Sequence, residues 1–140
     1  MKTKILLLVL ACVMLISCGK KEVKPVSQES KMTMEAFALA ETVKNAFIVK
    51  DNITLKKNST ESGYKDITAN TRSFDGVEIT FTPRWVDMEK DKLEVNISWK
   101  STWIASGKST AERGMAVFVM EGSPLKVSNI LRANPFVMPE

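Results

Sequence analysis

Alternation of apolar and polar residues between positions 93 and 103, interrupted at Ser101, is the feature that most constrains the fold. The apolar members fall on one side of an extended chain: Leu93, Val95, Ile97, Trp99 and Trp103. The polar members fall on the other side: Glu94, Asn96, Ser98, Lys100 and Thr102. Successive side chains of a β-strand point to opposite faces of its sheet, so this pattern predicts a strand with one buried face.

Three further segments predict strands that pair with this one. Alternation over 77–85 places four apolar side chains on one face: Val77, Ile79, Phe81 and Trp85. Pro83 has no amide proton, so this strand is expected to be an edge strand or to be bulged at that point. The run 113–120 is apolar on both faces, as in a central strand, and 125–136 is the last strand. Polar turns at 89–91, 105–108 and 121–124 join them into an antiparallel meander of four or more strands.

Apolar residues at three- and four-residue spacing predict one long helix before the strands. They form a single stripe: Ala36, Leu39, Ala40, Val43, Ala46 and Phe47. We expect Thr33 to cap its N-terminus and the helix to end near Lys50. Two short helices are expected, one after Asn52 and one over 64–69. The predicted fold class is α+β, with these helices packed on a curved antiparallel sheet in one domain over residues 33–140.

The N-terminal residues carry a pattern of a different kind. Lys2 and Lys4 precede an unbroken apolar run over 5–16. These 12 residues would span only about 18 Å as a helix, whereas the core of a bilayer is about 30 Å thick. The sequence Leu15-Ile16-Ser17-Cys18 resembles the lipobox of bacterial lipoproteins, in which a signal peptidase cuts before the cysteine. A transmembrane helix and an ordinary secretory signal are the two other interpretations.

The lipobox resemblance implies a membrane anchor. Residues 1–17 would be a signal peptide that is cleaved between Ser17 and Cys18, and residues 18–32 would be a lipidated tether. The membrane is then a partner through acyl chains on Cys18, and two or three chains hold a protein durably. An Asp after the cysteine commonly signals retention in the inner membrane of Gram-negative bacteria. Gly19 therefore implies the outer membrane, with the domain facing the periplasm.

Composition limits the chemistry of the remaining domain. Without Lys2 and Lys4 the basic residues fall from 20 to 18 against 16 acidic residues, so the net charge is +2 and nucleic acid is not an expected partner. The chain has no histidine, and its two cysteines lie in the signal peptide and at the lipidation site. Histidine-dependent triads and Cys/His zinc sites are thereby excluded. We expect no metal and no cofactor.

Two other motifs receive structural interpretations. Gly107-Lys108-Ser109-Thr110 resembles the end of a phosphate-binding loop, but Thr102 stands where that loop needs its first glycine, so we expect a hairpin turn. The acidic residues around 87–94 lack the spacing of a calcium loop and predict a solvated turn.

The candidate site residues form two sets. The larger set would either line a pocket for an apolar ligand or form the hydrophobic core: Phe47, Phe81, Trp85, Trp99, Trp103 and Met115. The smaller set is Tyr64 with Asp66, which would be a donor–acid pair if the protein were an enzyme. Their structural interpretation is a packing tyrosine and a capping aspartate.

The order of the elements resembles the nuclear transport factor 2-like (SnoaL-like) superfamily over residues 34–136. The hairpin 92–120 and the closing segment 125–136 carry most of the resemblance. It implies a cone-like sheet that curls around the helices and encloses a cavity. Enzymes of that family place His, Asp or Tyr in the cavity, but none of their catalytic patterns transfers to a residue here.

Three functions are therefore open. The leading hypothesis is a membrane-anchored envelope lipoprotein with a non-catalytic domain that binds a small apolar ligand or an envelope protein. The second is an enzyme that uses carboxylate and tyrosine acid–base chemistry. The third is a structural or assembly lipoprotein. An open cavity with a buried acid would favour the enzyme, whereas a filled interior with an exposed apolar patch would favour docking.

Overall fold

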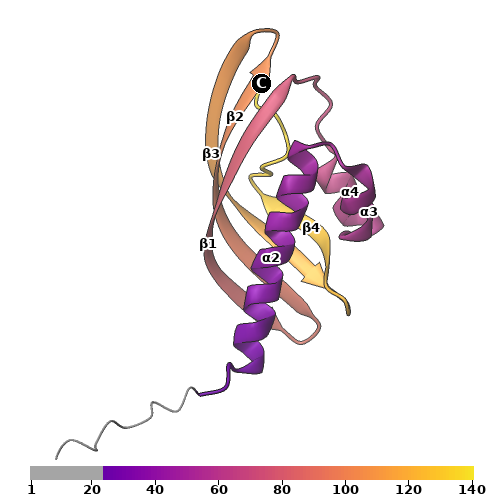
Figure 1. Cartoon of the computed structure of the whole chain (residues 1–140), viewed down its shortest axis with the longest axis vertical. Helices are drawn as coiled ribbons and strands as arrows, with labels where there is room; N and C mark the ends of the chain where they lie inside the picture. The colour runs from indigo at the N-terminus through magenta and orange to yellow at the C-terminus, as the bar shows by residue number, and fades with distance from the viewer. Residues whose placement is uncertain (1–23) are drawn as a thin grey trace, which may run out of the picture.

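The computed structural model describes residues 24–140, so the signal segment, Ser17 and Cys18 lie outside the described residues. The helices are α2 (Gln28–Ile48), α3 (Asn52–Lys57) and α4 (Glu61–Ile67). The strands follow as β1 (Gly76–Glu89), β2 (Lys92–Ala105), β3 (Lys108–Glu121) and β4 (Lys126–Arg132). They form one antiparallel open sheet in the order β1-β2-β3-β4, on which the three helices pack (Figure 1). The predicted α+β class is confirmed. Within the described part of the chain, no helix is both long and apolar enough to cross a membrane.

The long helix begins earlier than the sequence suggested. Ser27 is extended and its side chain accepts a hydrogen bond from the backbone N–H of Ser30, so Ser27 is the N-cap and the prediction of Thr33 was wrong. An acidic residue in the first turn, Glu29, adds a favourable interaction with the helix dipole. The helix thus includes residues expected in the tether. The buried stripe is confirmed: Ala36, Leu39, Ala40, Val43, Ala46 and Phe47.

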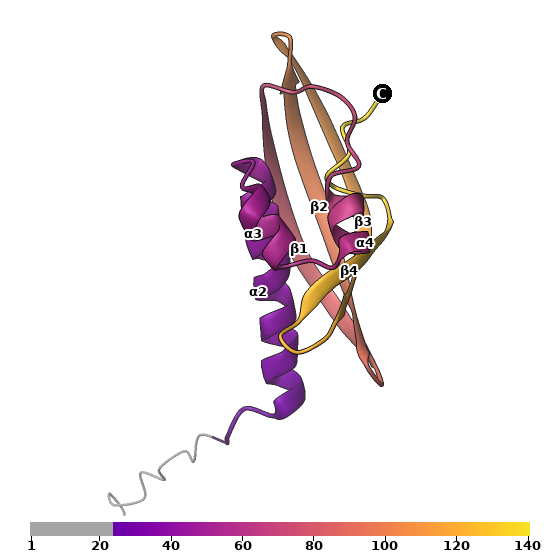
Figure 2. The same cartoon turned by 90° about the vertical axis from the view of Figure 1, so that its right-hand side faces the viewer.

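One face of the sheet, the inner face, packs on α2 (Figure 2). Aromatic side chains fill the space between these two layers: Phe47, Phe74, Phe81, Trp103, Phe118 and Phe136. The ring centroids of Phe47 and Phe136 are 4.7 Å apart, and those of Phe74 and Trp103 are 4.9 Å apart. Phe118 and Phe136 are completely buried. The interior of the domain is therefore a packed aromatic core.

A bulge in β1 changes which side chains face this core. Phe81 pairs with Trp99, but the register shifts between Pro83 and Trp85, as the predicted bulge at Pro83 requires. The extra residue is Arg84, and alternation is reversed beyond it. Trp85 therefore lies on the face opposite Phe81, and the prediction that both share one face was wrong.

The last strand is shorter than predicted, because it ends at Arg132 and the chain then turns. Phe136 is folded back into the core, where it is fully buried. The edge of β4 that has no neighbouring strand is covered by the residues just before α4 and by α4 itself. The backbone N–H of Thr60 donates to the Val127 carbonyl at 2.9 Å, and the Val127 N–H donates to the Asn58 carbonyl at 3.0 Å. These bonds satisfy backbone groups that an open edge would leave free.

Candidate functional site

Tyr64 and Asp66 are not brought together in a cavity. Oδ2 of Asp66 accepts a hydrogen bond from the backbone N–H of Ile130 at 2.8 Å, which joins α4 to β4. The Asp66 carbonyl accepts another from the Asn134 amide at 2.8 Å. Tyr64 packs against the core, and the Lys56 ammonium lies 5.5 Å from its ring centroid. Both residues thus make contacts that hold the helices to the sheet.

The predicted aromatic set is divided between the two faces of the sheet. Four of its members are buried on the inner side: Phe47, Phe81, Trp99 and Trp103. The buried indoles have local partners, since Nε1 of Trp99 donates to the Ala133 carbonyl at 2.9 Å and Nε1 of Trp103 donates to Oγ of Ser101 at 3.0 Å. Met115 and Trp85 lie apart from this core. The structure therefore does not assemble the six side chains around one pocket.

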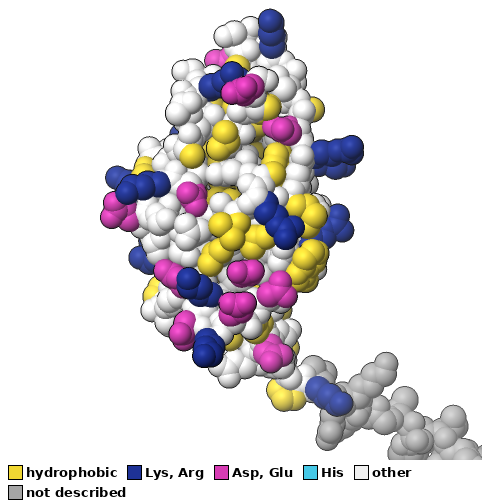
Figure 3. All heavy atoms as spheres, turned by 180° about the vertical axis from the view of Figure 1, so that it is seen from behind, with side chains coloured by type: hydrophobic (Ala, Val, Ile, Leu, Met, Phe, Trp, Pro, Cys, Tyr) yellow, Lys and Arg dark blue, Asp and Glu magenta, His cyan; other side chains and the backbone are white. Residues whose placement is uncertain are grey.

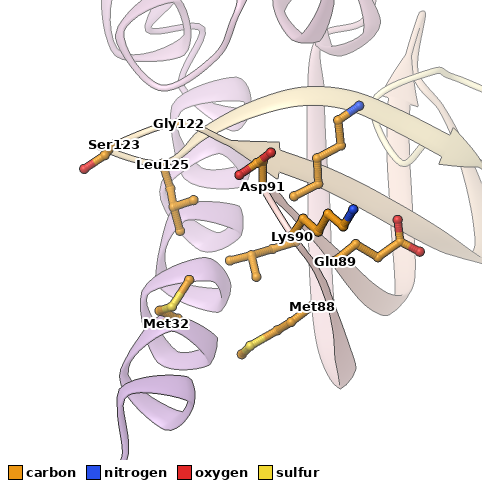
Figure 4. Close-up of a pocket in the computed structure, with 10 residues that line it drawn as sticks. Met32, Met88, Glu89, Lys90, Asp91, Gly122, Ser123 and Leu125 are labelled. Atoms are coloured by element: carbon orange, nitrogen blue, oxygen red, sulfur yellow. The ribbon is translucent and has the colours of Figure 1, made fainter.

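A surface pocket of about 520 Å³ lies beside the β1–β2 turn (Figure 4). Met32 of α2, Met88 of β1 and Leu125 of the β3–β4 connection contribute apolar side chains to it. The remaining wall is largely the charged turn, which runs from Glu89 to Lys92. The pocket is open to solvent at the end of the sheet where α2 begins.

The second face of the sheet, the outer face, is not covered by any helix of residues 24–140 (Figures 1 and 2). One cross-strand row runs over all four strands of this face: Trp85, Asn96, Val117 and Leu131. The two ends of the row are apolar side chains in solvent, with Trp85 50% exposed and Leu131 46% exposed. Figure 3 shows hydrophobic side chains gathered in the middle of this face. We call these four residues the central row.

The indole of Trp85 is held by Asp87, which also accepts a hydrogen bond from Asn96. Nε1 of Trp85 donates to Oδ2 of Asp87 at 2.9 Å, and the side-chain amide of Asn96 donates to the same oxygen at 3.2 Å. Asn96 is only 3% exposed, although it points to the uncovered face. The aromatic ring is thus held in place before any partner arrives, which reduces the entropy lost on binding.

Cationic side chains lie on one side of the central row. Lys100 and Arg113 are paired on β2 and β3, and Arg84 projects from the bulge of β1. With the hydroxyl-bearing Thr82 and Ser98 they line an open pocket of about 550 Å³. Nε of Arg84 donates to Oγ of Ser98 at 2.6 Å. The ion pairs found between described residues are Glu41–Lys44 and Glu61–Lys65, so these three cations have no acidic partner there.

Acidic side chains lie on the other side of the central row. Asp87 and Glu94 are directly paired across β1 and β2. The next row outward, toward the end where α2 begins, is mixed in charge: Glu89, Lys92, Glu121 and Lys126. In Figure 3 the acidic side chains are concentrated in this lower part of the face. The rows that flank the centre of the outer face are thus cationic on one side and acidic on the other, while Glu78 lies beyond the cations and Lys92 and Lys126 lie beyond the acids.

The other motifs have structural roles. The turn between β2 and β3 pairs Ala105 with Lys108, and both Ser106 and Gly107 have positive φ, as a tight hairpin requires. The predicted hairpin turn is confirmed. Within residues 24–140, no group of three or more His, Cys, Asp or Glu side chains is arranged to hold a metal ion.

The central row was missed at the level of sequence because Trp85 was assigned to the inner face. The available signal was Pro83 followed by Arg84, which marks the bulge that reverses the alternation. Comparison with known proteins adds no relative, since no family model, no curated protein and no solved structure matches this chain.

Proposed function

We propose that this chain is a lipid-anchored protein of the bacterial envelope that acts by binding a protein partner on the outer face of its sheet. The observation that carries this proposal is the central row. Trp85 and Leu131 are half exposed at its two ends, on a face that the described helices leave open. Between these two ends Asn96 and Val117 are buried. Large apolar side chains exposed on an uncovered face are typical of protein interaction sites.

Binding rather than catalysis is supported by the contacts of the candidate acid–base residues. The Asp66 carboxylate is engaged with the backbone of β4, and Tyr64 packs at the core. The proposal includes the nuclear transport factor 2-like architecture with a cone-like sheet, which the order of long helix, short helices and antiparallel strands supports. In this chain aromatic side chains occupy the region where such a fold keeps its cavity.

The anchor is proposed from the sequence Leu15-Ile16-Ser17-Cys18. Signal cleavage before Cys18 would leave a short polar tether before Ser27, where α2 begins. Gly19 supports an outer-membrane location with the domain in the periplasm. Labelling of cells with a radioactive fatty acid tests this part: the wild-type protein is expected to be labelled, and Cys18→Ser is expected to lose the label. An unchanged label on the Cys18→Ser variant would overturn the anchor.

The binding surface is tested by a photo-crosslinking amino acid placed on the full chain in cells. The probe p-benzoylphenylalanine at Leu131 is expected to give a protein adduct of defined mass. The matched control is the same probe at Ile53, which is apolar, 83% exposed and located on α3 away from the sheet. Substitution of Trp85 by Lys in the same row should abolish the Leu131 adduct. No adduct at Leu131, or equal adducts at both positions, would contradict the proposal.

A further inference from the structure

Opposite charges on the outer face lie at symmetric positions about the middle of β2. Ile97 is at the middle of β2, and Lys100 lies three residues beyond it while Glu94 lies three residues before it. Both side chains alternate to the outer face, because Ile97 itself is buried on the inner face. Arg113 stands beside Lys100 and Asp87 stands beside Glu94. Lys100 and Glu94 therefore place opposite charges on one strand at equal distances from Ile97.

This arrangement is self-complementary under a two-fold rotation. Consider an axis that lies between two facing sheets and crosses the strands at Ile97. The rotation reverses the strand direction, so Lys100 of one copy lies over Glu94 of the other, and the reciprocal contact forms at the same time. The central row of each copy then meets the row that contains Ser98 and Met115 on the other. We propose that the occupant of the outer face is a second copy of this chain, packed face to face with antiparallel strands.

The available area agrees with this occupant. The strands β1, β2 and β3 have 14 residues each, which gives a face roughly 45 Å long. Four strands spaced about 4.8 Å apart make it roughly 15–19 Å wide. The face therefore offers on the order of 700 Å² per copy, close to the roughly 800 Å² that each partner contributes to a standard interface. Aligned packing of two sheets at about 10 Å leaves room for the interdigitated side chains.

The contacts of the central row fit the same packing. Trp85 of one copy would lie over β1 of the other copy beside the bulge, where Arg84 offers a guanidinium. A guanidinium interacts favourably with the face of an indole ring. Lys100, which has no acidic partner among the described residues, would then lie over Glu94 of the other copy, because the rotation places β2 over β2.

The inference rests on the proposed function, since it names the partner of the same surface. The test uses the full chain, extracted from membranes in detergent after co-expression of two copies with different C-terminal tags. One variant carries Lys100→Glu, so that the two positions that meet across the axis, 100 and 94, are both acidic. The other carries Glu94→Lys, so that both positions are basic. We expect two wild-type copies to co-purify. For two copies of either variant, the amount of the second copy recovered with the first should fall at least tenfold.

The decisive result is the mixture of the two variants. An acidic face and a basic face are complementary on both sides of the axis, so the mixed pair is expected to co-purify at the wild-type level. A control with Lys57→Glu changes the net charge by the same amount as Lys100→Glu, at an exposed helical position, and should leave co-purification unchanged. Absence of wild-type pairing, unaffected pairing in each variant alone, or failure of the mixed pair would each overturn the proposal.

A second variant keeps the test independent of the charge reversals. Leu131→Cys lies near the axis, and a bifunctional maleimide with a spacer of about 13 Å should join two copies of it at the separation set by aligned sheets. Ile53→Cys on α3 is the matched control and should not be joined. No covalent dimer of Leu131→Cys would also overturn self-association. If the photo-crosslink at Leu131 instead gives an adduct with a different protein, the proposed binding function stands and only the identity of the partner is wrong.

Discussion

Gly63 of α4 lies directly against the backbone of Val127 in β4, so closely that a Cβ atom at position 63 would be 2.0 Å from the Val127 carbonyl oxygen. The same carbonyl accepts the hydrogen bond from Thr60 that begins the cover of the sheet edge. The helix can approach the strand this closely only because position 63 has no side chain. The close contact explains why a residue that weakens helices stands in the middle of a short one.

The first prediction is that Gly63→Ala destabilises the domain. In a solvent-exposed helix this change would stabilise by about 1 kcal/mol, but here the new methyl group must displace backbone, and we expect a net loss of about 2–3 kcal/mol. Gly76→Ala is the control, because a Cβ atom there has no neighbour within 4 Å. Denaturant unfolding of both variants measures the difference. Equal stability of the two would show that α4 moves away from β4 at no cost.

The second prediction compares two tryptophans on opposite faces of the sheet. Trp99 is 3% exposed and bonded to Ala133, whereas Trp85 is 50% exposed. We expect Trp99→Ala to lower the free energy of unfolding by about 3–5 kcal/mol, because it leaves a cavity in the core. Trp85→Ala should cost less than about 1 kcal/mol. Thermal or chemical unfolding at low protein concentration provides the values, and similar losses in both variants would contradict the assignment of faces.

The third prediction concerns the start of α2. Ser27→Ala removes the acceptor of the Ser30 N–H and should destabilise the first helical turn by about 1 kcal/mol. Thr33→Ala is the control, since Thr33 lies inside the helix, where alanine is the better helix former. Amide hydrogen exchange at residues 29–32 should accelerate in the first variant only. Faster exchange in Thr33→Ala alone would show that Thr33, and not Ser27, is the N-cap.

The fourth prediction is a pH dependence at Asp51, which caps α3. The hydroxyl of Thr54 and the backbone N–H groups of Thr54 and Ile53 donate to its carboxylate and lower the pKa of Asp51 below its usual range. A lowered folded-state pKa adds stability above the pKa of the unfolded chain, and this stability is lost as the pH falls through the folded-state pKa.

Asp51→Asn can still cap the helix but does not titrate. The difference in melting temperature between wild type and Asp51→Asn should therefore be largest near about pH 6 and should shrink toward about pH 2. A difference that stays constant over this range would show that the Asp51 carboxylate is not stabilised by the cap.

Much of the architecture follows from local patterns. The apolar stripe of α2, the alternation of β2, the hairpin turn at Gly107 and the bulge at Pro83 were each predictable, because each depends on residues close together in sequence. The face of the sheet on which Trp85 lies was not predictable in this way, because the extra residue in the bulge reverses the alternation between Phe81 and Trp85. The position of the helix start was missed because both Ser27 and Thr33 have side chains that can cap a helix.

The sequence by itself determined the α+β class, the antiparallel order of the strands and the absence of histidine chemistry, because periodicity and composition are properties of the chain alone. Only the tertiary structure decided that the aromatic residues fill the interior, that Asp66 holds an edge strand, and that Trp85, Asn96, Val117 and Leu131 form one row. The physical reason is register: hydrogen bonds between strands align residues that are far apart in sequence, and a single extra residue in β1 changes the face of every side chain beyond it.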